Sequence, residues 1–586
     1  MEPPRTFTEL ALRRTFELGG REAYLFVTAD RDGRLVHDSV SYAELGLTAR
    51  RLASRLQQRG ASGGRVLILQ GNGRLFITSF LACLFAGAVP VPAPPPIGSR
   101  HSVERVANIV RDAAVCCVLT DAASASAVSH LLANIGHIEV DCLATDRMRL
   151  DSDADWVPPA AGPDDIAFLQ YTSGSVSEPK GVMVSHRGLL ANELTIHRAT
   201  DSTPDSRVGG WLPFHHDMGL VGHLLQPLWL GGTGVLMPPM TFVKRPLRWL
   251  QMIDRYGITI GGGPNLAYDL CVRRVKDEEI GALDLSRWRV AVNGAEPVRA
   301  ETMEAFSRRF APAGFRAESF YPCYGLAEAT LLVSGGTPDR RAEQRVVDAA
   351  ALEQHRIRPA AAGHRPRTLT SSGRPLGCTV RIVDPDTRGP LSDGEVGEVW
   401  VRGESVSGGY WNRPLENAHA FRAETTDGDG GYLRTGDLGS MSDGELFITG
   451  RLKDIMFVAG RNLYPQDIER SLQRVSALLG TSAAFAVEGD RDHVVVVQEV
   501  RASREHPAEF ASLSAGVQQC IAREFEVAVE NVLLVRPGTV RRTTSGKLRR
   551  VTMRELFLRG ELQPLHEVMS PELRELVGGV RRAVQS

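Results

Sequence analysis

The sequence predicts an α/β protein: a large N-terminal domain of parallel or mixed sheets covered by helices, followed by a small, mobile α+β C-terminal domain. The chain has 586 residues, which is too long for one hydrophobic core and implies at least two domains. Short apolar runs alternate with helical segments through most of the chain, and this alternation is typical of parallel sheets covered by helices. The C-terminal part carries fewer such runs, enough for a small separate domain.

Strand and helix signals follow one another between residues 66 and 293. Each short apolar run is bounded by glycine, proline or polar residues, as expected for buried strands, and the longer segments between them have apolar residues at helical spacing. Strand-like runs cover 66–70, 89–91, 115–119, 166–169, 208–212, 235–237, 258–260 and 290–293, and helical segments cover 75–86, 103–113, 245–256 and 266–279.

The predicted domain boundary lies between residues 451 and 452, so that residues 1–451 form the N-terminal domain and 452–586 the C-terminal one. Residues 338–368 are rich in Ala and Arg and only weakly periodic, which predicts an insertion or connector. In the C-terminal domain, strands are predicted at 483–487, 494–500 and 532–535, and helices at 466–475 and 513–525.

Composition and charge narrow the class of protein. Hydrophobic residues make up 43% and charged residues 23% of the chain, which is ordinary for a soluble globular protein. Lys plus Arg at 68 against Asp plus Glu at 69 leaves a net charge of −1, so neither nucleic acid nor an anionic membrane is the expected main partner. The eight cysteines have no metal-site spacing and are expected to be buried thiols in a reducing compartment. No signal-peptide core or membrane-spanning apolar stretch is recognised, so a cytoplasmic location is expected.

A loop rich in hydroxyl groups and glycine follows the strand-like run 166–169 and reads Tyr-Thr-Ser-Gly-Ser-Val-Ser-Glu-Pro-Lys-Gly over 171–181. Gly174 lets backbone N–H groups approach an anion, and Lys180 adds a positive charge. The spacing is not that of a Walker loop. An ordinary surface loop has the same composition, and only the residue order favours phosphate binding. The hydroxyl donors are Thr172, Ser173, Ser175 and Ser177.

Two further segments place polar or aromatic side chains after a predicted strand. In Trp-Leu-Pro-Phe-His-His-Asp-Met-Gly-Leu (211–220), His216 is predicted to hydrogen-bond or gate a substrate carboxylate, and His215 to cap the helix or satisfy backbone groups. In the segment 318–330, the ring of Tyr324 beside Gly325 offers a stacking face for adenine. Glu328, four residues on, can hold the Mg²⁺ that ATP brings. The alternative for Tyr324 is packing alone.

A probable hairpin carries Asp437 and Arg451, within Tyr-Leu-Arg-Thr-Gly-Asp-Leu (432–438) and Gly-Arg-Leu-Lys-Asp (450–454). A carboxylate accepts two hydrogen bonds at once, which matches the vicinal hydroxyls of a ribose, and Arg451 can reinforce the same edge. The alternative is a turn aspartate beside a glycine, which is common.

Lys547 follows Thr-Ser-Gly in the basic segment 541–550, a flexible stalk that can reach into a cleft. A cation placed between two reacting anions lowers the barrier by stabilising the developing charge. The neighbouring arginines at 541, 542, 549 and 550 are expected to form a solvated face.

These segments, in this order, resemble the motifs of the adenylate-forming superfamily of acyl-CoA synthetases, peptide-synthetase adenylation domains and luciferases. The resemblance covers about residues 66–550, and departs at Val176, where relatives carry Thr or Ser, and at Ala327, where they usually carry Thr. Four segments resemble the fatty acyl-AMP ligases in particular: His-His-Asp-Met-Gly-Leu, Tyr-Gly-Leu-Ala-Glu-Ala-Thr, Gly-Gly-Pro-Asn-Leu-Ala-Tyr-Asp (262–269) and Gly-Arg-Asn-Leu-Tyr-Pro-Gln-Asp-Ile-Glu (460–469).

The resemblance implies a role for each segment. The loop 172–180 closes over the phosphates of ATP, Lys453 is the pivot of the C-terminal domain, and Lys547 is the catalytic lysine, with His216 and the Mg²⁺ ligand Glu328 beside it. The subfamily also carries an insertion before the hinge, for which residues 338–368 are the candidate. The nucleotide-binding residues implied are Thr172, Ser173, Gly174, Ser175, Lys180, Asn293, Gly294, Ala295, Tyr324, Gly325, Asp437 and Arg451.

The activity implied is activation of a fatty acid by ATP to an acyl-adenylate, followed by transfer to the phosphopantetheine thiol of an acyl carrier protein of the polyketide-synthase or peptide-synthetase type. A fatty acyl-CoA synthetase and a catalytically weakened acyl-nucleotide binding protein, to which Val176 points, are the alternatives. An amino-acid adenylation domain is disfavoured, because residues 230–269 offer no charged partner for an ammonium group beyond Asp269, which is expected to face outward on a helix.

Overall fold

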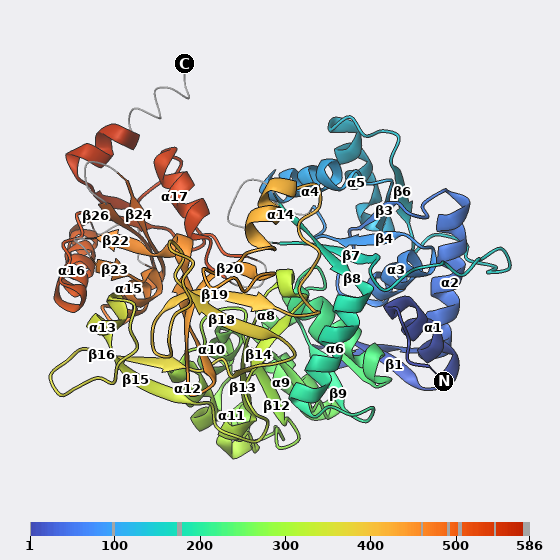
Figure 1. The fold of residues 1–586 in the computed structure, drawn as a ribbon, viewed down its shortest axis with the longest axis horizontal. Helices are drawn as coiled ribbons and strands as arrows, with labels where there is room; N and C mark the ends of the chain where they lie inside the picture. The colour runs from blue at the N-terminus through green and yellow to red at the C-terminus, as the bar shows by residue number, and fades with distance from the viewer. Residues whose placement is uncertain are drawn as a thin grey trace.

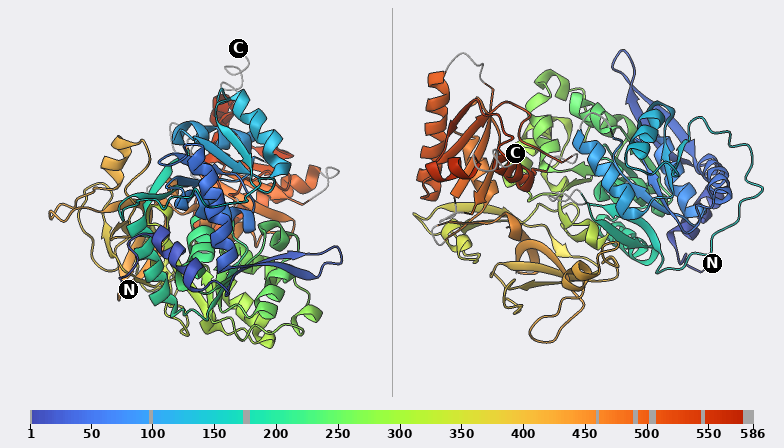
Figure 2. Two further views of the ribbon diagram at one scale, coloured as in Figure 1. Left: turned by 90° about the vertical axis from the view of Figure 1, so that its right-hand side faces the viewer. Right: turned by 90° about the horizontal axis from the view of Figure 1, so that it is seen from above.

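The computed structural model describes residues 2–96, 100–172, 179–458, 461–488, 493–501, 507–543 and 547–577. Helices and strands alternate along the large N-terminal part, and the C-terminal elements gather on one side of it (Figures 1 and 2). The α/β fold class, with a smaller C-terminal domain, is therefore confirmed. Among the described residues, no helix combines the length and the apolar character needed to cross a membrane.

A nine-stranded sheet forms the centre of the large domain. Its inner strands pair in parallel, while antiparallel pairs lie at both edges. In spatial order the strands are β17 (Arg374–Pro375), β14 (Leu332–Gly335), β13 (Phe320–Gly325), β12 (Val290–Asn293), β11 (Ile260–Gly263), β9 (Arg207–Gly210), β10 (Thr233–Leu236), β1 (Glu22–Ala29) and β2 (Leu35–Ser41).

Strand β11 differs from its predicted position at 258–260, and glycine is the reason. The strand reads Ile-Gly-Gly-Gly, so it lacks the apolar signature of a buried strand. A Cβ atom added at Gly261 would lie 2.1 Å from the carbonyl oxygen of Gly209, and one added at Gly262 would lie 2.0 Å from that of Val292. Only glycine permits this close approach of neighbouring backbones.

A second sheet of four parallel strands packs beside the first. Next to it, β7 and β8 form an antiparallel hairpin that brackets the predicted phosphate loop. The bounds are β4 (Val89–Pro92), β3 (Arg65–Ile68), β5 (Cys117–Thr120) and β6 (Asp141–Ala144) in the sheet, and β7 (Ile166–Tyr171) and β8 (Gly181–Ser185) in the hairpin.

Helices cover these sheets, and their buried faces form the two largest apolar clusters of the protein. The predicted helix 266–279 is broken, because Val275 adopts an extended conformation (φ −79°, ψ 129°) that ends its first part. The helices are α1 (Phe7–Glu17), α2 (Tyr42–Gln58), α3 (Arg74–Phe85), α4 (Arg100–Ala113), α5 (Ala122–Asn134), α6 (His186–Thr200), the π-helix η1 (Met218–Leu225), α7 (Gln226–Leu230), α8 (Pro239–Lys244), α9 (Leu247–Tyr256), α10 (Asn265–Arg274), α11 (Asp277–Ile280), α12 (Ala300–Phe310), and the 3₁₀ turns η2 (Ala311–Ala313), η3 (Ala317–Ser319) and η4 (Ala327–Ala329).

An antiparallel four-stranded sheet follows and ends at the predicted domain boundary. Its last two strands are the predicted hairpin, in which Asp437 lies directly opposite Arg451. The elements are β18 (Thr379–Val383), β19 (Gly397–Arg402), α14 (Pro414–Ala420), β20 (Leu433–Ser442) and β21 (Glu445–Arg451).

The C-terminal elements form an α+β unit with sheets of its own. All three predicted strands and both predicted helices are present, with ends shifted by a few residues. The elements are η5 (Leu452–Asp454), β22 (Met456–Val458), β23 (Arg461–Leu463), α15 (Pro465–Leu472), β24 (Leu479–Val487), β25 (His493–Val500), α16 (Pro507–Phe525), β26 (Asn531–Val535), α17 (Arg550–Leu558) and β27 (His566–Val568).

Residues 338–368 have more structure than their weak periodicity indicates, since they contribute β15 (Gln344–Asp348), α13 (Ala349–Glu353) and part of β16 (Pro366–Thr370). These elements lie directly beneath the C-terminal unit (Figure 1). Glu353, which is 7% exposed, forms ion pairs with Arg365 and, at 2.7 Å, with Arg461 of β23. The side-chain amide of Asn462 donates to the carbonyl oxygen of Glu353 at 3.0 Å. Segment 338–368 is therefore attached to the C-terminal unit.

Three further expectations need correction. Cys116 is exposed and Cys142, Cys323 and Cys378 are partly exposed, so only four of the eight thiols are buried. Asp269 does not face outward, because it accepts a 2.9 Å hydrogen bond from Thr302 of α12 and packs against that helix. The basic segment is not uniformly solvated, as described below for Arg550.

Candidate active site

A small cavity between the two domains brings several of the predicted residues together. It is lined by Ala295, Tyr324 and Gly325 from the large domain and by Lys547 from the C-terminal domain. Asp217, at the start of η1, lies on the same wall. Residues that lie far apart in the sequence thus face one space.

Tyr324, Asp437 and Arg451 form a hydrogen-bonded chain. The Tyr324 hydroxyl donates to Asp437 at 2.8 Å, and Nε of Arg451 donates to the other oxygen of that carboxylate at 2.7 Å. Burial and the Asp437 charge raise the pKa of Tyr324, and Asp437 raises the pKa of Arg451. Tyr324 and Arg451 therefore keep their protons at neutral pH, and both donate to the Asp437 carboxylate.

A second network links the ends of the phosphate loop to Glu328. The hydroxyl of Tyr410 donates to Oε1 of Glu328 at 2.8 Å. The ammonium group of Lys180 lies 5.0 Å from the centre of the Tyr410 ring and pairs with Glu416. The charge of Asp437 and, to a smaller extent, that of Glu328 raise the pKa of Arg451, so the two networks adjoin.

The loop itself is described only at its ends. The backbone N–H of Thr172 donates to the carbonyl oxygen of Lys180 at 3.1 Å, which closes the β7–β8 hairpin. Ser173, Gly174 and Ser175 lie outside the described residues.

His215 and His216 lie beside this space with ring centres 4.7 Å apart. Burial, with a contribution from Arg105, lowers the pKa of His215 to about 3, and burial together with His215, Arg105 and Lys547 lowers that of His216. Both imidazoles are therefore neutral at pH 7. Burial raises the pKa of Asp217, while Lys547 acts in the opposite direction, which places Lys547 within electrostatic reach of both His216 and Asp217.

The segment Asn293 to Ala295 ends β12 beside β13. A Cβ atom at Gly294 would lie 2.7 Å from the sulfur of Cys323, so this position requires glycine. The amide of Asn293 is buried and donates to the side chain of Asn265 at 3.2 Å, and its side chain therefore points to the core. What this segment offers a ligand is its backbone.

The described ends of the basic segment differ in character. Lys547 reaches the cavity, whereas Arg550 is only 16% exposed and ion-pairs with Asp454 at 2.8 Å and with Glu469 at 2.7 Å. Arg550 is therefore part of the internal structure of the C-terminal domain, not of a solvated face. Lys453 lies in η5, exposed, at the junction of the two domains.

Sequence reasoning missed Arg105 and Tyr410. Arg105 of α4 extends toward the backbone carbonyls of Tyr171 and Thr172, both at 3.5 Å, and burial lowers its pKa to about 10. Neither residue lies in a recognisable motif, and only their position in the fold brings them to the phosphate loop. Asp217 lies within the motif 211–220, but no spacing in the sequence connects it to Lys547.

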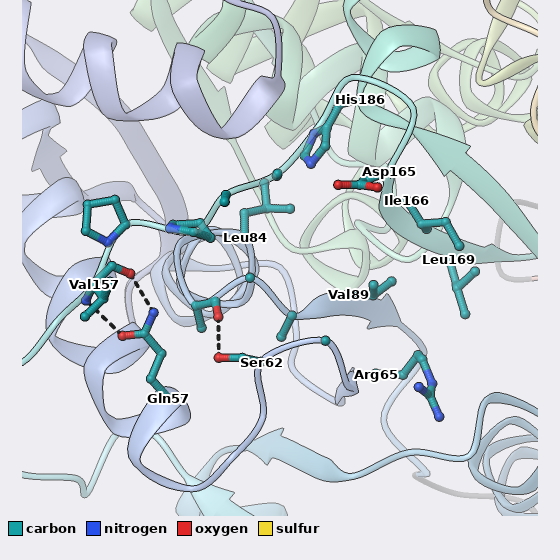
Figure 3. Close-up of a pocket in the computed structure, with 18 of the residues that line it drawn as sticks. Gln57, Ser62, Arg65, Leu84, Val89, Val157, Asp165, Ile166, Leu169 and His186 are labelled. Carbon is teal, nitrogen blue, oxygen red and sulfur yellow. Dashed lines mark hydrogen bonds between the residues drawn. The ribbon is translucent and has the colours of Figure 1, made fainter.

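A larger groove of about 910 Å³ lies elsewhere, between α2, α3 and the start of β7 (Figure 3). None of the predicted site residues lines it. Its polar side chains are largely occupied, since Gln57 exchanges hydrogen bonds with Val157, Ser62 donates to Ala86 and Arg65 donates to Ala113. Size alone therefore does not mark the site.

The model of the AMP-binding enzyme family matches residues 19–411, and a model described as the AMP domain of Disco-interacting protein 2-like proteins matches residues 453–567. The chain belongs to the AMP-binding enzyme family. Within this family its similarity extends over whole chains that are named as fatty acid ligases, which places this AMP-binding enzyme with the fatty acyl-AMP ligases.

Three proteins illustrate this similarity along the whole chain. The medium-chain fatty acid–[acyl-carrier-protein] ligase JamA of Moorena producens is 40% identical over 95% of this chain and 96% of its own. The 4-hydroxyphenylalkanoate adenylyltransferase of Mycobacterium tuberculosis is 36% identical over 96% and 93%. The crystal structure of a Legionella pneumophila fatty acyl-adenylate ligase with acyl adenylate and pyrophosphate has 36% identity and a TM-score of 0.75, covering 96% of this AMP-binding enzyme and 98% of that chain.

Proposed function

We propose that this enzyme activates a fatty acid with ATP, forming an acyl-adenylate and pyrophosphate, and passes the acyl group to the phosphopantetheine thiol of an acyl carrier protein. One observation carries the proposal: Lys547 of the C-terminal domain lines the same cavity as Tyr324 and Ala295 of the large domain. The relative named as an acyl-carrier-protein ligase, which matches along almost the whole chain, supports the choice of acceptor. A cytoplasmic location is part of the proposal.

The nucleotide would lie along the Tyr324–Asp437–Arg451 network. The Asp437 carboxylate has the acceptor capacity for both ribose hydroxyls, and Arg451 keeps that carboxylate in place. The Tyr324 ring would stack on adenine, with Gly325 and the backbone of residues 293–295 along its edge. The loop 172–180, including Ser173, Gly174 and Ser175, would close over the phosphates, with Lys180 at its end.

Glu328 fits the role of the Mg²⁺ ligand. Its Oε1 accepts a hydrogen bond from Tyr410, and its other oxygen accepts none from the described residues. A carboxylate in this state suits Mg²⁺, which is commonly held by one or two carboxylates and the substrate phosphates. When bound there, the ion would neutralise phosphate charge.

Lys547 and His216 would act on the reacting groups. The ammonium group of Lys547 would stabilise the negative charge that develops when the fatty acid carboxylate attacks the α-phosphate. Neutral His216 would donate a hydrogen bond to that carboxylate or gate its approach. Rotation of the C-terminal domain about Lys453 would then withdraw Lys547 and admit the acceptor thiol.

The adenylation half is tested by ATP–pyrophosphate exchange with and without a fatty acid. Exchange that depends on fatty acid and on Mg²⁺ is expected. A protein that binds acyl-adenylate but exchanges no pyrophosphate would instead be the catalytically weakened binding protein.

The acceptor is tested by mass spectrometry of the products formed with no thiol, with coenzyme A and with holo acyl carrier protein. We expect acyl-adenylate alone, little acyl-CoA and abundant acyl carrier protein thioester, respectively. Equal rates with coenzyme A and the carrier protein would replace the proposed acceptor and leave the adenylation step intact.

A further inference from the structure

The cavity that Lys547 enters continues into the large domain, away from the predicted nucleotide site. Along β13 it is lined from Gly325 back to Tyr321, and along the helices from Met218 of η1 to Gln226 of α7. The four residue steps from Gly325 to Tyr321 span roughly 13 Å of strand. The cavity has a volume of about 80 Å³. In the proposed reaction it would hold a segment of the acyl chain.

Its lining is apolar in part, as an alkyl chain requires. Ile196, Val208, Ile260, Leu331 and Leu332 all contribute. Burial of a hydrocarbon chain against such a wall stabilises the complex by about 25 cal/mol per Å² of apolar surface removed from water. This term contributes affinity but does not select for a polar group on the chain.

Gln226 breaks this pattern. Its side chain is 2% exposed and lines the cavity, yet neither its amide oxygen nor its amide nitrogen has a hydrogen-bond partner among the described residues. His223 and Tyr321 line the same cavity and are 3% and 2% exposed. Nδ1 of His223, which lies against Gly210, and the hydroxyl of Tyr321, which lies against Gly335, also have no hydrogen-bond partner among the described residues. Buried polar groups are nearly always paired, and leaving one unpaired costs about 1–3 kcal/mol.

Thr200 provides the contrast. Thr200 lines the same cavity, but its hydroxyl donates to the carbonyl oxygen of Ile196 at 2.8 Å. The unpaired atoms therefore belong to particular residues and are not a general property of this wall.

The chemistry of these groups selects the kind of partner. Burial lowers the pKa of His223 to about 4, so it is neutral at pH 7, as are the amide of Gln226 and the phenol of Tyr321. The charged residues in the lining, Asp217 and Lys547, belong to the part of the cavity at the start of η1. A charged group near Gln226 would be desolvated without an opposite charge. A hydroxyl group is the smallest neutral group that can both accept from the amide nitrogen and donate to the amide oxygen.

We propose that the acyl substrate of this enzyme carries a hydroxyl group, alcoholic or phenolic, at its end remote from the carboxylate, and that Gln226 binds it in the cavity that His223 and Tyr321 also line. This inference rests on the proposed function and specifies its substrate class. Gln226 is then a specificity-determining residue for the adenylation step.

The test compares unsubstituted fatty acids with their ω-hydroxy counterparts, from hexanoic to dodecanoic acid, together with ω-(4-hydroxyphenyl) and ω-phenyl acids. ATP–pyrophosphate exchange gives kcat/KM for each pair. At the chain length that fits, we expect the hydroxylated acid to be preferred about 10- to 100-fold, the range that corresponds to one unpaired buried polar group. If ordered water instead pairs with Gln226, the enzyme should show no preference for the hydroxylated acid at any chain length. That result would overturn the inference.

Gln226→Met keeps the length of the side chain and removes its hydrogen-bonding atoms. We expect it to abolish the preference and to raise the melting temperature, because unpaired amide atoms leave the interior. Thr200→Val is the matched control in the same cavity and should keep the preference. A preference that survives in Gln226→Met would assign the selectivity to other residues and refute the role given to Gln226.

The two levels of failure are distinguishable. Exchange with neither acid of any pair would refute the proposed function. Equal exchange with both acids would leave that function standing and refute only the hydroxyl site.

Discussion

The hydroxyl of Tyr324 donates a 2.8 Å hydrogen bond to Asp437, joining two segments that lie 113 residues apart in the chain. The bond orients the carboxylate before any ligand arrives, and Arg451 holds its other oxygen. Since a carboxylate has about four acceptor positions, both bonds can persist while ribose hydroxyls use the remaining positions.

Loss of the Tyr324 hydroxyl and loss of the Asp437 charge should both weaken ATP binding, the second more than the first. Tyr324→Phe keeps the ring and loses only the hydroxyl, so the KM for ATP should rise roughly 3- to 10-fold, as for one neutral hydrogen bond. Asp437→Asn loses a charged acceptor and should raise it by about 10- to 100-fold. Exchange kinetics at varied ATP measure both effects.

Tyr432→Phe is the control, because its hydroxyl donates to Asp429, ahead of β20 and outside this network. An equal increase in KM for this variant would show that the effect of Tyr324→Phe is a general loss of stability.

Lys547→Ala should affect chemistry more than binding. Loss of one group that stabilises developing charge typically lowers kcat by about 10²- to 10³-fold. The KM for ATP should change little, and transfer from a supplied acyl-adenylate should remain. Lys276→Ala removes a lysine whose side chain is 71% exposed and should leave all three quantities unchanged. Exchange by Lys547→Ala within twofold of the parent rate would remove this lysine from the mechanism.

Glu353→Gln should loosen the attachment of segment 338–368 to the C-terminal domain. Glu353 is buried between Arg365 and Arg461, and neutralising it removes the buried carboxylate that the two guanidinium groups share. Hydrogen exchange should become faster in α13 and β23, while the core of the large domain stays protected. Glu526→Gln, which removes an 82% exposed partner of Arg461, should have little effect. Unchanged exchange in Glu353→Gln would show that other contacts hold the two parts together.

Stability should fall on mild acidification because several histidines are buried in neutral form. Burial lowers the pKa of His186 and His223 to about 4 and that of His215 to about 3, against an ordinary value near 6.5. Between pH 6.5 and 4 the unfolded chain binds protons that the folded chain does not, so stability decreases as the pH decreases. Each residue should contribute a loss of about 2 kcal/mol by pH 5.

Denaturant unfolding at pH 7 and pH 5 measures this loss. His186→Gln should reduce the difference between the two pH values, while the exposed His130, replaced in the same way, should not. An identical pH dependence in His186→Gln and the parent protein would contradict the assignment.

The resemblance to a known superfamily led to the expectation that Tyr324, Gly325, Ala295 and Lys547 lie together, and all four line one cavity. Convergence of strand ends accounts for the residues of the large domain, but not for Lys547, which comes from the C-terminal domain. The sequence was sufficient to predict the hairpin that sets Asp437 opposite Arg451. The functions assigned to these residues stay predictions until the variants are measured.

What escaped prediction depends on long-range contacts. Arg105 and Tyr410 come close to the phosphate loop only after α4 and the segment before α14 are in place. Glu353 lies in no recognisable motif, and its partners Arg365 and Arg461 are in separate segments of the chain. Strand β11 is rich in glycine for a reason visible only in the neighbouring backbones.

Arg550 fastens the segment that bears the lysine to the first turns of the C-terminal domain through Asp454 and Glu469. Lys547 is thus carried on an arm that is anchored beside Lys453, the proposed pivot. A swing of that arm would remove the lysine and expose the acyl end in one movement, without a separately timed loop. The two half-reactions would then exclude each other in time, and a loaded enzyme could not activate a second fatty acid until it had discharged the first.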